Sequence, residues 1–344
     1  MRGPRGPATC AAAVLLVVAC EGESGMHDGN TLPGADRELR PLLDGELWTV
    51  GGGPADTLLF LPVAIGASGG AVFLLDRFGH RVAALDAATG ALAWTRGRRG
   101  GGPGELDSPR AMTIGADGAL AIADGANPRL ARFAHDGSVG APIPLRDAGV
   151  AQAVCGLADG GWLVATLDPA ARLLRLAPEG AVLDTLSLPG PYEDSASVLT
   201  TQVVLAGGGE EPCTLLYAVG AGFAVWDDST FAPFRPFIEP VAPPRVEVRG
   251  NLRRRSEQLA EPVAAALDAA LVDDEVWVLF GGASDSARRL LDRYGRDHGE
   301  YRGSWVLPSA ADGFAVDDER LFLLVRRSGY PAVVTVPRPR RGAD

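Results

Sequence analysis

DGANPRLARFAHDG at residues 124–137 repeats the pattern of DRFGHRVAALDAATG at residues 76–90. The first Asp of the second copy and its following Arg both lie 48 positions after their counterparts. A fixed period of this size indicates a repeat architecture, in which each unit cannot bury its apolar face alone and packs on its neighbours. The sequence therefore predicts an array of similar units.

Hairpin turns extend the repeat through the chain, because each unit should place a short Asp/Gly turn between two alternating apolar strands. Six such turns occur, at residues 68, 117, 159, 207, 273 and 317. Successive turns are therefore 49, 42, 48, 66 and 44 residues apart. The long interval contains a Pro-rich excursion and then a polar segment that we expect to be helical. Residues 233–262 are thus predicted to be an insertion on one loop.

A second hairpin follows the first in several units, which gives four strands per unit. Units of roughly 40 to 50 residues with four short strands are typical of β-propeller blades. We therefore predict an all-β fold: a six-bladed β-propeller with four-stranded antiparallel blades over residues 46–338, followed by a polar tail at 339–344. The last unit shows three strands, so we expect the strand ELWTV at residues 46–50 to complete it and close the ring.

The first 45 residues have a different character. Arg2 and Arg5 precede the apolar run AAAVLLVVA, which is typical of a secretory signal peptide rather than a membrane span. VVAC, which ends at Cys20, resembles the lipobox of bacterial lipoproteins, and the resemblance implies cleavage before Cys20 and its lipidation. We expect a signal peptide at 1–19, a flexible tether at 20–45, and an exported lipoprotein of the bacterial cell envelope, in the periplasm or at the outer membrane. The alternative is an ordinary signal peptide whose cysteine is incidental.

Two cysteines remain once Cys10 is removed and Cys20 is lipidated. Cys155 and Cys213 fall in neighbouring predicted blades, and an oxidising compartment would allow them to form a disulfide. The other interpretation, which the sequence favours, is two buried thiols that pack as small apolar side chains.

The charged residues exclude several classes of function. All 32 basic residues are arginine, and the net charge is -11. Without lysine the chain can form neither a Schiff base nor a phosphate-loop lysine contact. Its acidity argues against nucleic-acid binding, which depends on neutralising phosphates.

The histidines do not predict a metal centre. His27 lies in the tether, while His80, His135 and His298 lie in peripheral hairpin turns, where they cannot converge on one ion. We predict no cofactor and assign no metal ligand. A cage of Asp, Glu and Asn in the central channel could nevertheless hold Ca²⁺ without histidine.

GRRGGGPGELDSPRAMTIGADGALAIADGANPRLARFAHDG at residues 97–137 resembles an NHL repeat. The residues that match its pattern are Asp124, Asn127, Arg129, Asp136 and Gly137. The resemblance implies a six-bladed propeller, but this family contains both binding modules and enzymes, so it does not decide function. ALDAATGALAW at residues 84–94 resembles a repeat of eight-bladed quinoprotein propellers, but it occurs once and six turns do not make eight blades.

The predicted binding surface is the rim that carries the loops between second and third strands together with the crossovers between blades. Arginine can grip carboxylate or phosphate groups there, and the Gly-rich loop at residues 100–104 leaves backbone N–H groups accessible. The candidate ligand-binding residues on this rim are Arg77, Arg81, Arg98, Arg99, Arg110, Asn127 and Arg129. The alternative is structural, because the repeated pairs Asp76/Arg81 and Asp124/Arg129 can brace the loops between strands.

We therefore expect a monomeric, lipid-anchored binding module whose partner is a protein, a peptide or an anionic small ligand. We expect no nucleic-acid partner, membrane contact through the lipid anchor only, and no catalytic residue. The alternative is a metal-dependent hydrolase or lyase of the six-bladed propeller type, centred on the channel. Three or more carboxylate, Asn or His side chains converging on the ring axis would favour that alternative.

Overall fold

The computed structural model describes residues 37–42, 45–145, 149–167, 172–189, 203–209, 211–218, 222–227, 229–239, 245–251, 254–260, 264–282 and 286–340. The chain divides into residues 1–32 and 33–344, and all described residues belong to the second unit. The predicted signal peptide, Cys20 and the tether up to residue 36 lie outside the described residues. Within the described ranges, no helix has the length and apolar character needed to cross a membrane.

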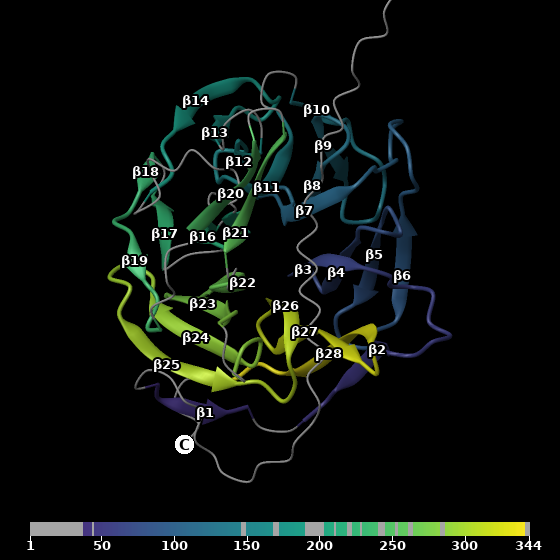
Figure 1. Cartoon of the computed structure of the whole chain (residues 1–344). Helices are drawn as coiled ribbons and strands as arrows, with labels where there is room; N and C mark the ends of the chain where they lie inside the picture. The colour runs from purple at the N-terminus through teal and green to yellow at the C-terminus, as the bar shows by residue number, and fades with distance from the viewer. Residues whose placement is uncertain are drawn as a thin grey trace, which may run out of the picture. The chain divides into compact units, whose positions relative to one another are not determined.

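The strands form six four-stranded antiparallel blades in a ring, which confirms the predicted six-bladed β-propeller (Figure 1). Blade 1 consists of β3 (Pro62–Ser68), β4 (Ala71–Asp76), β5 (Arg81–Asp86) and β6 (Leu92–Arg96). Blade 2 consists of β7 (Pro109–Ile114), β8 (Leu120–Asp124), β9 (Arg129–Phe133) and β10 (Ile143–Pro144). Blade 3 consists of β11 (Ala151–Gly156), β12 (Trp162–Thr166), β13 (Arg172–Leu176) and β14 (Val182–Leu186).

The remaining blades follow the same plan with local additions. Blade 4 consists of β15 (Val203–Gly208), β16 (Glu211–Tyr217), β17 (Gly222–Asp227) and the short β18 (Thr230–Phe231) and β19 (Arg235–Pro236), which both pair with β17. Blade 5 consists of β22 (Ala266–Val272), β23 (Glu275–Phe280), β24 (Leu290–Gly295) and β25 (Tyr301–Val306). Blade 6 consists of β26 (Ala311–Val316), β27 (Arg320–Arg327), β28 (Tyr330–Pro337) and β2 (Trp48–Gly51).

The second strands explain why the blades stack. AVFLLD in β4 and EVWVLF in β23 are almost continuous apolar runs, and every residue in them is buried. Such a run suits a strand that packs on both faces. The described residues accordingly form six apolar clusters, one between each pair of neighbouring blades.

The N-terminal strand β2 closes the ring, as predicted. It runs antiparallel to β28, with Trp48 opposite Thr335 and Val50 opposite Val333. The indole N–H of Trp48 also donates to the carbonyl oxygen of Ala87 in blade 1, at 3.1 Å. The closing strand therefore contacts both sides of the seam between blades 6 and 1.

A second N-terminal strand, β1 (Leu39–Pro41), was not predicted. It pairs in parallel with β25, so that blade 5 has five strands. The interpretation of residues 20–45 as a flexible tether is therefore wrong for its last part, because residues 37–42 belong to the propeller. The sequence LRP has no apolar alternation that would indicate a strand.

The insertion predicted at residues 233–262 differs from its prediction in secondary structure. Its polar part is a hairpin of β20 (Arg245–Asn251) and β21 (Arg254–Ala260), which forms a two-stranded sheet of its own, and not a helix. The alternation in VEV has the period of a strand, and the ladder pairs the two strands from Arg245 and Ala260 to Asn251 and Arg254. Residues of β21 that favour a helix adopt the strand conformation, because the pairing with β20 outweighs that preference.

Cys155 on β11 and Cys213 on β16 form a disulfide between blades 3 and 4, with their Cα atoms 6.0 Å apart. Both side chains are fully buried. The bond closes a loop with a sequence separation of 58 residues. In the chain-entropy description, a disulfide that closes a loop of this length stabilises the folded state by about 4 kcal/mol.

Candidate functional site

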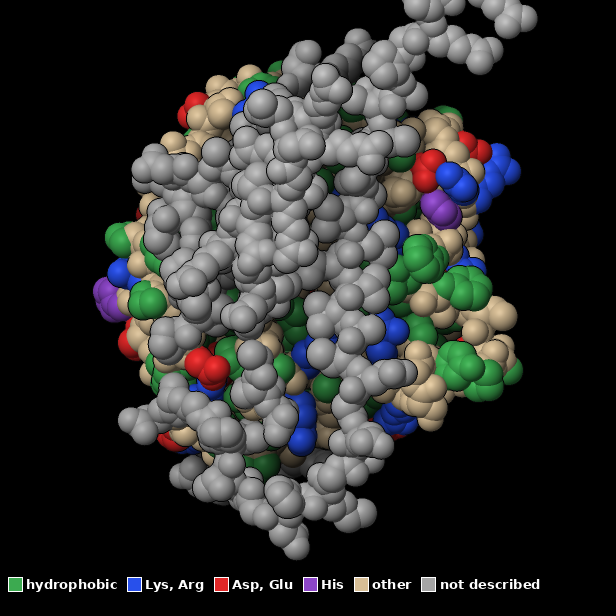
Figure 2. All heavy atoms as spheres, in the orientation of Figure 1, with side chains coloured by type: hydrophobic (Ala, Val, Ile, Leu, Met, Phe, Trp, Pro, Cys, Tyr) green, Lys and Arg blue, Asp and Glu red, His purple; other side chains and the backbone are tan. Residues whose placement is uncertain are grey.

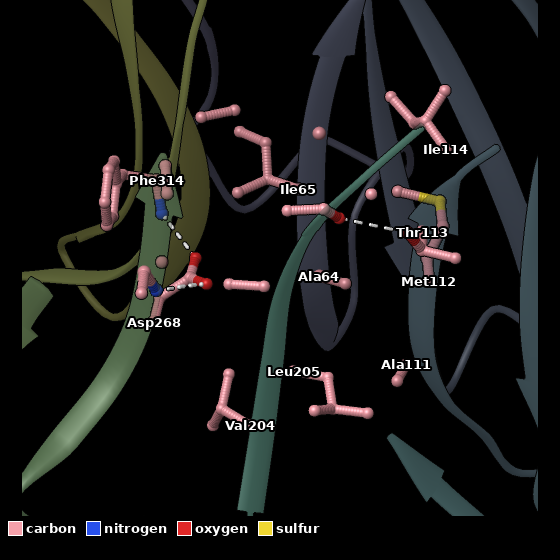
Figure 3. A pocket seen from close by; sticks show the side chains of 18 of the residues that line it. Ala64, Ile65, Ala111, Met112, Thr113, Ile114, Val204, Leu205, Asp268 and Phe314 are labelled. Atoms are coloured by element: carbon pink, nitrogen blue, oxygen red, sulfur yellow. Dashed lines mark hydrogen bonds between the residues drawn. The ribbon is translucent and has the colours of Figure 1, made fainter. Parts of the chain in front are cut away.

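The first strands of the six blades line a central cavity of about 580 Å³, the channel. This volume is typical of small-molecule sites, which span roughly 300 to 1,000 Å³. Most of the side chains that line it are apolar, and Figure 3 shows Ile65, Met112, Ile114, Leu205 and Phe314 around the space. The channel is thus the main candidate site among the described residues.

Five of the six inner strands begin with the same irregularity, a β-bulge of one extra residue. The extra residues, the bulge ring, are Val63, Arg110, Gln152, Leu267 and Asp312, and all of them line the channel. A bulge redirects side chains. Because each inner strand starts from the crossover between blades, the bulge ring lies at the mouth of the channel on the crossover rim.

Asp268 breaks the repeat at the next position. The residue that follows the bulge is Ala64, Ala111, Ala153 or Gly313 in four blades and Asp268 in blade 5. Figure 3 shows the carboxylate directed into the channel. A residue that recurs in every blade serves the scaffold, whereas a residue that occurs in a single blade is a candidate for binding a ligand.

The surroundings of Asp268 make it an unusual acid. Its carboxylate accepts the N–H groups of Ala269 and Phe314, both at 2.9 Å, and it has no ion pair with a described residue. Burial raises its pKa to about 7, and the two hydrogen bonds counteract this only in part. Asp268 therefore changes protonation near neutral pH.

Arg110 lies across the channel from Asp268, because β7 and β22 are three blades apart in the ring. Its Nε is buried and has no hydrogen-bond partner among the described residues. Burial, and secondarily the positive charge of Arg77, lowers the pKa of Arg110. Neither arginine pairs with a described carboxylate, whereas Asp312 is bound by Arg288 at 2.7 Å and by Arg326 at 3.0 Å.

The channel is therefore electrostatically polarised. Arg110, which pairs with no described carboxylate, lies on the side of blade 2, and the Asp268 carboxyl group lies on the side of blade 5. Figure 2 shows arginine side chains (blue) near the middle of the visible face. Phe60 and Phe78, which are 52% and 63% exposed, add apolar surface beside Arg77 on the rim of blade 1.

Two of the predicted rim residues brace the Gly-rich loop. Arg129 donates to the carbonyl oxygens of Gly101 at 2.7 Å, Gly102 at 3.1 Å and Glu105 at 2.8 Å, and to Asp124 at 3.1 Å. Asn127 donates to the carbonyl oxygen of Gly100 at 3.1 Å and to Asp124 at 2.8 Å. Arg129 and Asn127 thus stabilise the Gly-rich loop through hydrogen bonds within the protein.

Three further rim residues also have protein partners. Arg81 lies 3.8 Å from Asp76 and donates to the carbonyl oxygen of Leu58 at 2.6 Å. Arg98 pairs with Glu105 at 2.8 Å and Arg99 with Asp107 at 3.6 Å, although both guanidinium groups remain mostly exposed. The structural interpretation of the Asp76/Arg81 and Asp124/Arg129 pairs is confirmed. Of the seven predicted residues, Arg110 lines the channel, and the charge of Arg77 acts on it.

The described residues do not assemble a metal centre. His80 and His135 bind the backbone carbonyl oxygens of Leu106 at 3.1 Å and Ser68 at 3.2 Å. Within the described ranges, no group of three or more His, Cys, Asp or Glu residues is placed to hold an ion. The channel brings together two carboxylates, and Ca²⁺ takes six to eight oxygen ligands, so these residues do not make a Ca²⁺ site by themselves.

Sequence reasoning missed Asp268. The correspondence between Asp268 and the alanines Ala64 and Ala111 becomes visible when the inner strands are aligned on their β-bulges, which the structure gives. The lack of a partner for that acid depends on the assembled ring, so the sequence pattern does not contain it.

Comparison with known proteins shows the fold and no closer relationship. The sequence matches no protein-family model and no curated protein. Among solved structures, a Bacteroides fragilis protein thought to be exported has a TM-score of 0.56 and 11% identity, over 86% of this chain and 95% of that one. Virginiamycin B lyase from Staphylococcus aureus has a TM-score of 0.52 and 12% identity, over 84% and 98%. The calcium-binding protein regucalcin from Agrobacterium tumefaciens has a TM-score of 0.51 and 12% identity, over 88% and 97%.

Proposed function

We propose that this protein is an exported, lipid-anchored binding protein that takes a small ligand into the central channel of its propeller. The observation that carries the proposal is Asp268, an acid with no charged partner in the described part of the chain, at a position where four other blades have alanine or glycine. Arg110 in the channel lining, with Arg77 near it, supplies the opposite charge. The ligand site thus includes part of the predicted rim and extends inward from it.

Export and anchoring rest on the signal peptide at residues 1–19 and on Cys20. The disulfide between Cys155 and Cys213 supports an oxidising compartment, because such bonds are rare in the cytosol. One structural neighbour is also thought to be exported. The lipid anchor would hold the propeller, as a monomer, at the cell envelope.

A library screen by thermal shift tests the channel as the site, because a ligand that binds the folded state raises the melting temperature. The variant Met112→Trp fills the channel, and the double variant Arg98→Ala/Arg99→Ala alters the exposed rim only. Ligands should shift the wild type and the rim variant but not Met112→Trp. If ligands stabilise Met112→Trp as much as the wild type, the binding site lies outside the channel.

The alternative function is a channel-centred lyase or hydrolase. It is favoured by the pKa of Asp268, raised by burial to about 7, because an acid that titrates near neutrality suits proton transfer. One structural neighbour is named a lyase. Mass spectrometry of each bound compound after incubation would detect a product that the wild type makes and Asp268→Asn does not.

A Ca²⁺ ion in the channel is a further proposal, supported by the name of the regucalcin neighbour rather than by the described residues. Calorimetric titration of the EDTA-treated protein with Ca²⁺ tests it. Heat of binding that disappears in Asp268→Asn would place the ion at this acid, and the absence of heat would remove the ion from the proposal.

A further inference from the structure

We propose that the channel binds a small zwitterion with a free amino group and a free carboxylate, an amino acid or a short peptide, whose carboxylate faces Arg110 and whose ammonium group faces Asp268. The inference rests on the proposed function, because it needs the channel to be the ligand site. It adds the chemical class of the ligand and the orientation in which it lies.

The Arg110 side of the channel suits a carboxylate. Arg110 and Arg77 are close enough for one charge to affect the other, and no described carboxylate pairs with either. Arg110 lines the channel, although its Nε is buried beside Gly125, out of reach of a ligand. An anionic group beside the outer part of its guanidinium group would relieve the repulsion between the two guanidinium groups. Arginine binds carboxylates particularly well because its planar fork matches both oxygens.

The Asp268 side suits an ammonium group. An ionised carboxylate has about four lone-pair positions, and Asp268 uses two of them for backbone N–H groups. Its remaining acceptor capacity faces the channel (Figure 3). A cation there would favour the ionised form of the acid, which burial otherwise disfavours.

The separation of the two charges selects a ligand with both. Arg110 and Asp268 lie on opposite sides of the ring and form no ion pair with each other. A ligand with one charge would leave the other, partly buried protein charge without a counter-ion among the described residues. The apolar walls at Ile65, Met112 and Leu205 lie between them and suit an aliphatic body. A zwitterion with an apolar side chain satisfies all three parts of the channel.

Calorimetry with a defined series of probes tests the inference. The probes are leucine, dileucine and trileucine, each also as the N-acetyl and as the C-amide form, at pH 7.5, where Asp268 and the free amino groups of the probes, with a pKa of about 8, are both largely in their charged forms. At least one free form should bind ten or more times tighter than both of its blocked forms. Arg110→Gln should abolish the preference for carboxylate over amide, and Asp268→Asn the preference for free amine over acetyl. Arg99→Gln, a rim arginine paired with Asp107, is the matched control and should change neither.

The outcomes separate this inference from the proposed function. Equal binding of free and blocked probes, or no binding of any of the nine up to 10 mM, would overturn the zwitterion. Binding of inorganic phosphate alone, dependent on Arg110, would also overturn it and leave an anion site. Library compounds that carry only one charge or none could bind the wild type and not Met112→Trp. In that case the channel is the ligand site, but the ligand is not a zwitterion. If probes bind Met112→Trp unchanged, the channel itself is wrong.

Discussion

Arg37 holds the carboxylate of Asp292 with two hydrogen bonds, at 3.1 and 2.9 Å, although the two residues are 255 positions apart in the chain. Both side chains are almost fully buried, with exposures of 4% and 2%. Arg37 also pairs with Glu239 and lies over the ring of Phe280, 4.3 Å from its centroid. This ion pair fixes the short strand β1 onto blade 5.

Arg37→Met should lower the free energy of unfolding by about 3 to 5 kcal/mol, because it leaves the buried carboxylate of Asp292 without its counter-ion. Urea denaturation followed by circular dichroism measures the change. The control is Arg40→Met on the same strand, whose ion pair with Glu38 is exposed and should matter by less than about 1 kcal/mol. Equal losses in the two variants would contradict the assigned role of the buried pair.

A chain that begins at Asp56 should melt at a markedly lower temperature than one that begins at residue 35. The shorter chain lacks β1 and β2, so it exposes the edges of β25 and β28 at once, and the whole ring should respond in one transition. Calorimetric melting compares the two. An unchanged transition in the shorter chain would mean that the ring is stable without these strands.

The double variant Cys155→Ala/Cys213→Ala should be less stable than the oxidised wild type by about 4 kcal/mol, because a loop of this size is no longer closed in the unfolded chain. Denaturation with and without dithiothreitol measures the difference. Reductant should lower the stability of the wild type and leave the variant unaffected. If the wild type is unfolded and refolded in the presence of reductant and its stability does not change, the disulfide contributes nothing to stability.

Asp268→Asn should flatten the pH dependence of stability between about pH 4 and pH 7. Burial raises the pKa of Asp268 from 3.8 to about 7, so the folded protein keeps a proton that the unfolded chain releases. This contribution is complete below the unfolded pKa and is lost as the pH rises through the folded one. The other charged residues lining the channel, Arg110 and Asp312, are the same in both proteins. The stability of the variant relative to the wild type, from denaturation at pH 5 and pH 8, should be greater at pH 8.

Cys20→Ser should release the protein from membranes, because lipidation requires the thiol. Fractionation of cells followed by immunoblotting compares the membrane and soluble pools. The variant should move to the soluble fraction while remaining exported. If the variant stays with the membranes as firmly as the parent protein, Cys20 is not the anchor.

The architecture could be predicted because each blade carries its own turn, and the period of about 48 residues is visible without knowledge of the contacts. The role of ELWTV followed from counting strands in the last unit. Strand β1 escaped prediction because three residues without alternation give no signal, and what holds them is the contact of Arg37 with Asp292, far away in the chain.

The candidate site was predicted only in part. Arginine on the rim was identified by residue type, but type alone does not show that Arg129 turns inward to the carbonyl groups of the Gly-rich loop, while the Nε of Arg110 has no partner among the described residues. That distinction depends on which loops meet in the folded ring. The position of Asp268 in the repeat is defined by the β-bulge of its strand, and its raised pKa comes from burial in the channel.

The position of β1 and β2 at the beginning of the chain has a consequence for biogenesis. These strands are made first, yet their partners β25 and β28 are made last, so the ring cannot close until nearly the whole polypeptide is available. Contacts this distant in sequence slow folding. A chain crossing a membrane through a narrow translocon would thus remain open until its C-terminal blades arrive. A prematurely terminated product would keep β1 and β2 without their partner strands.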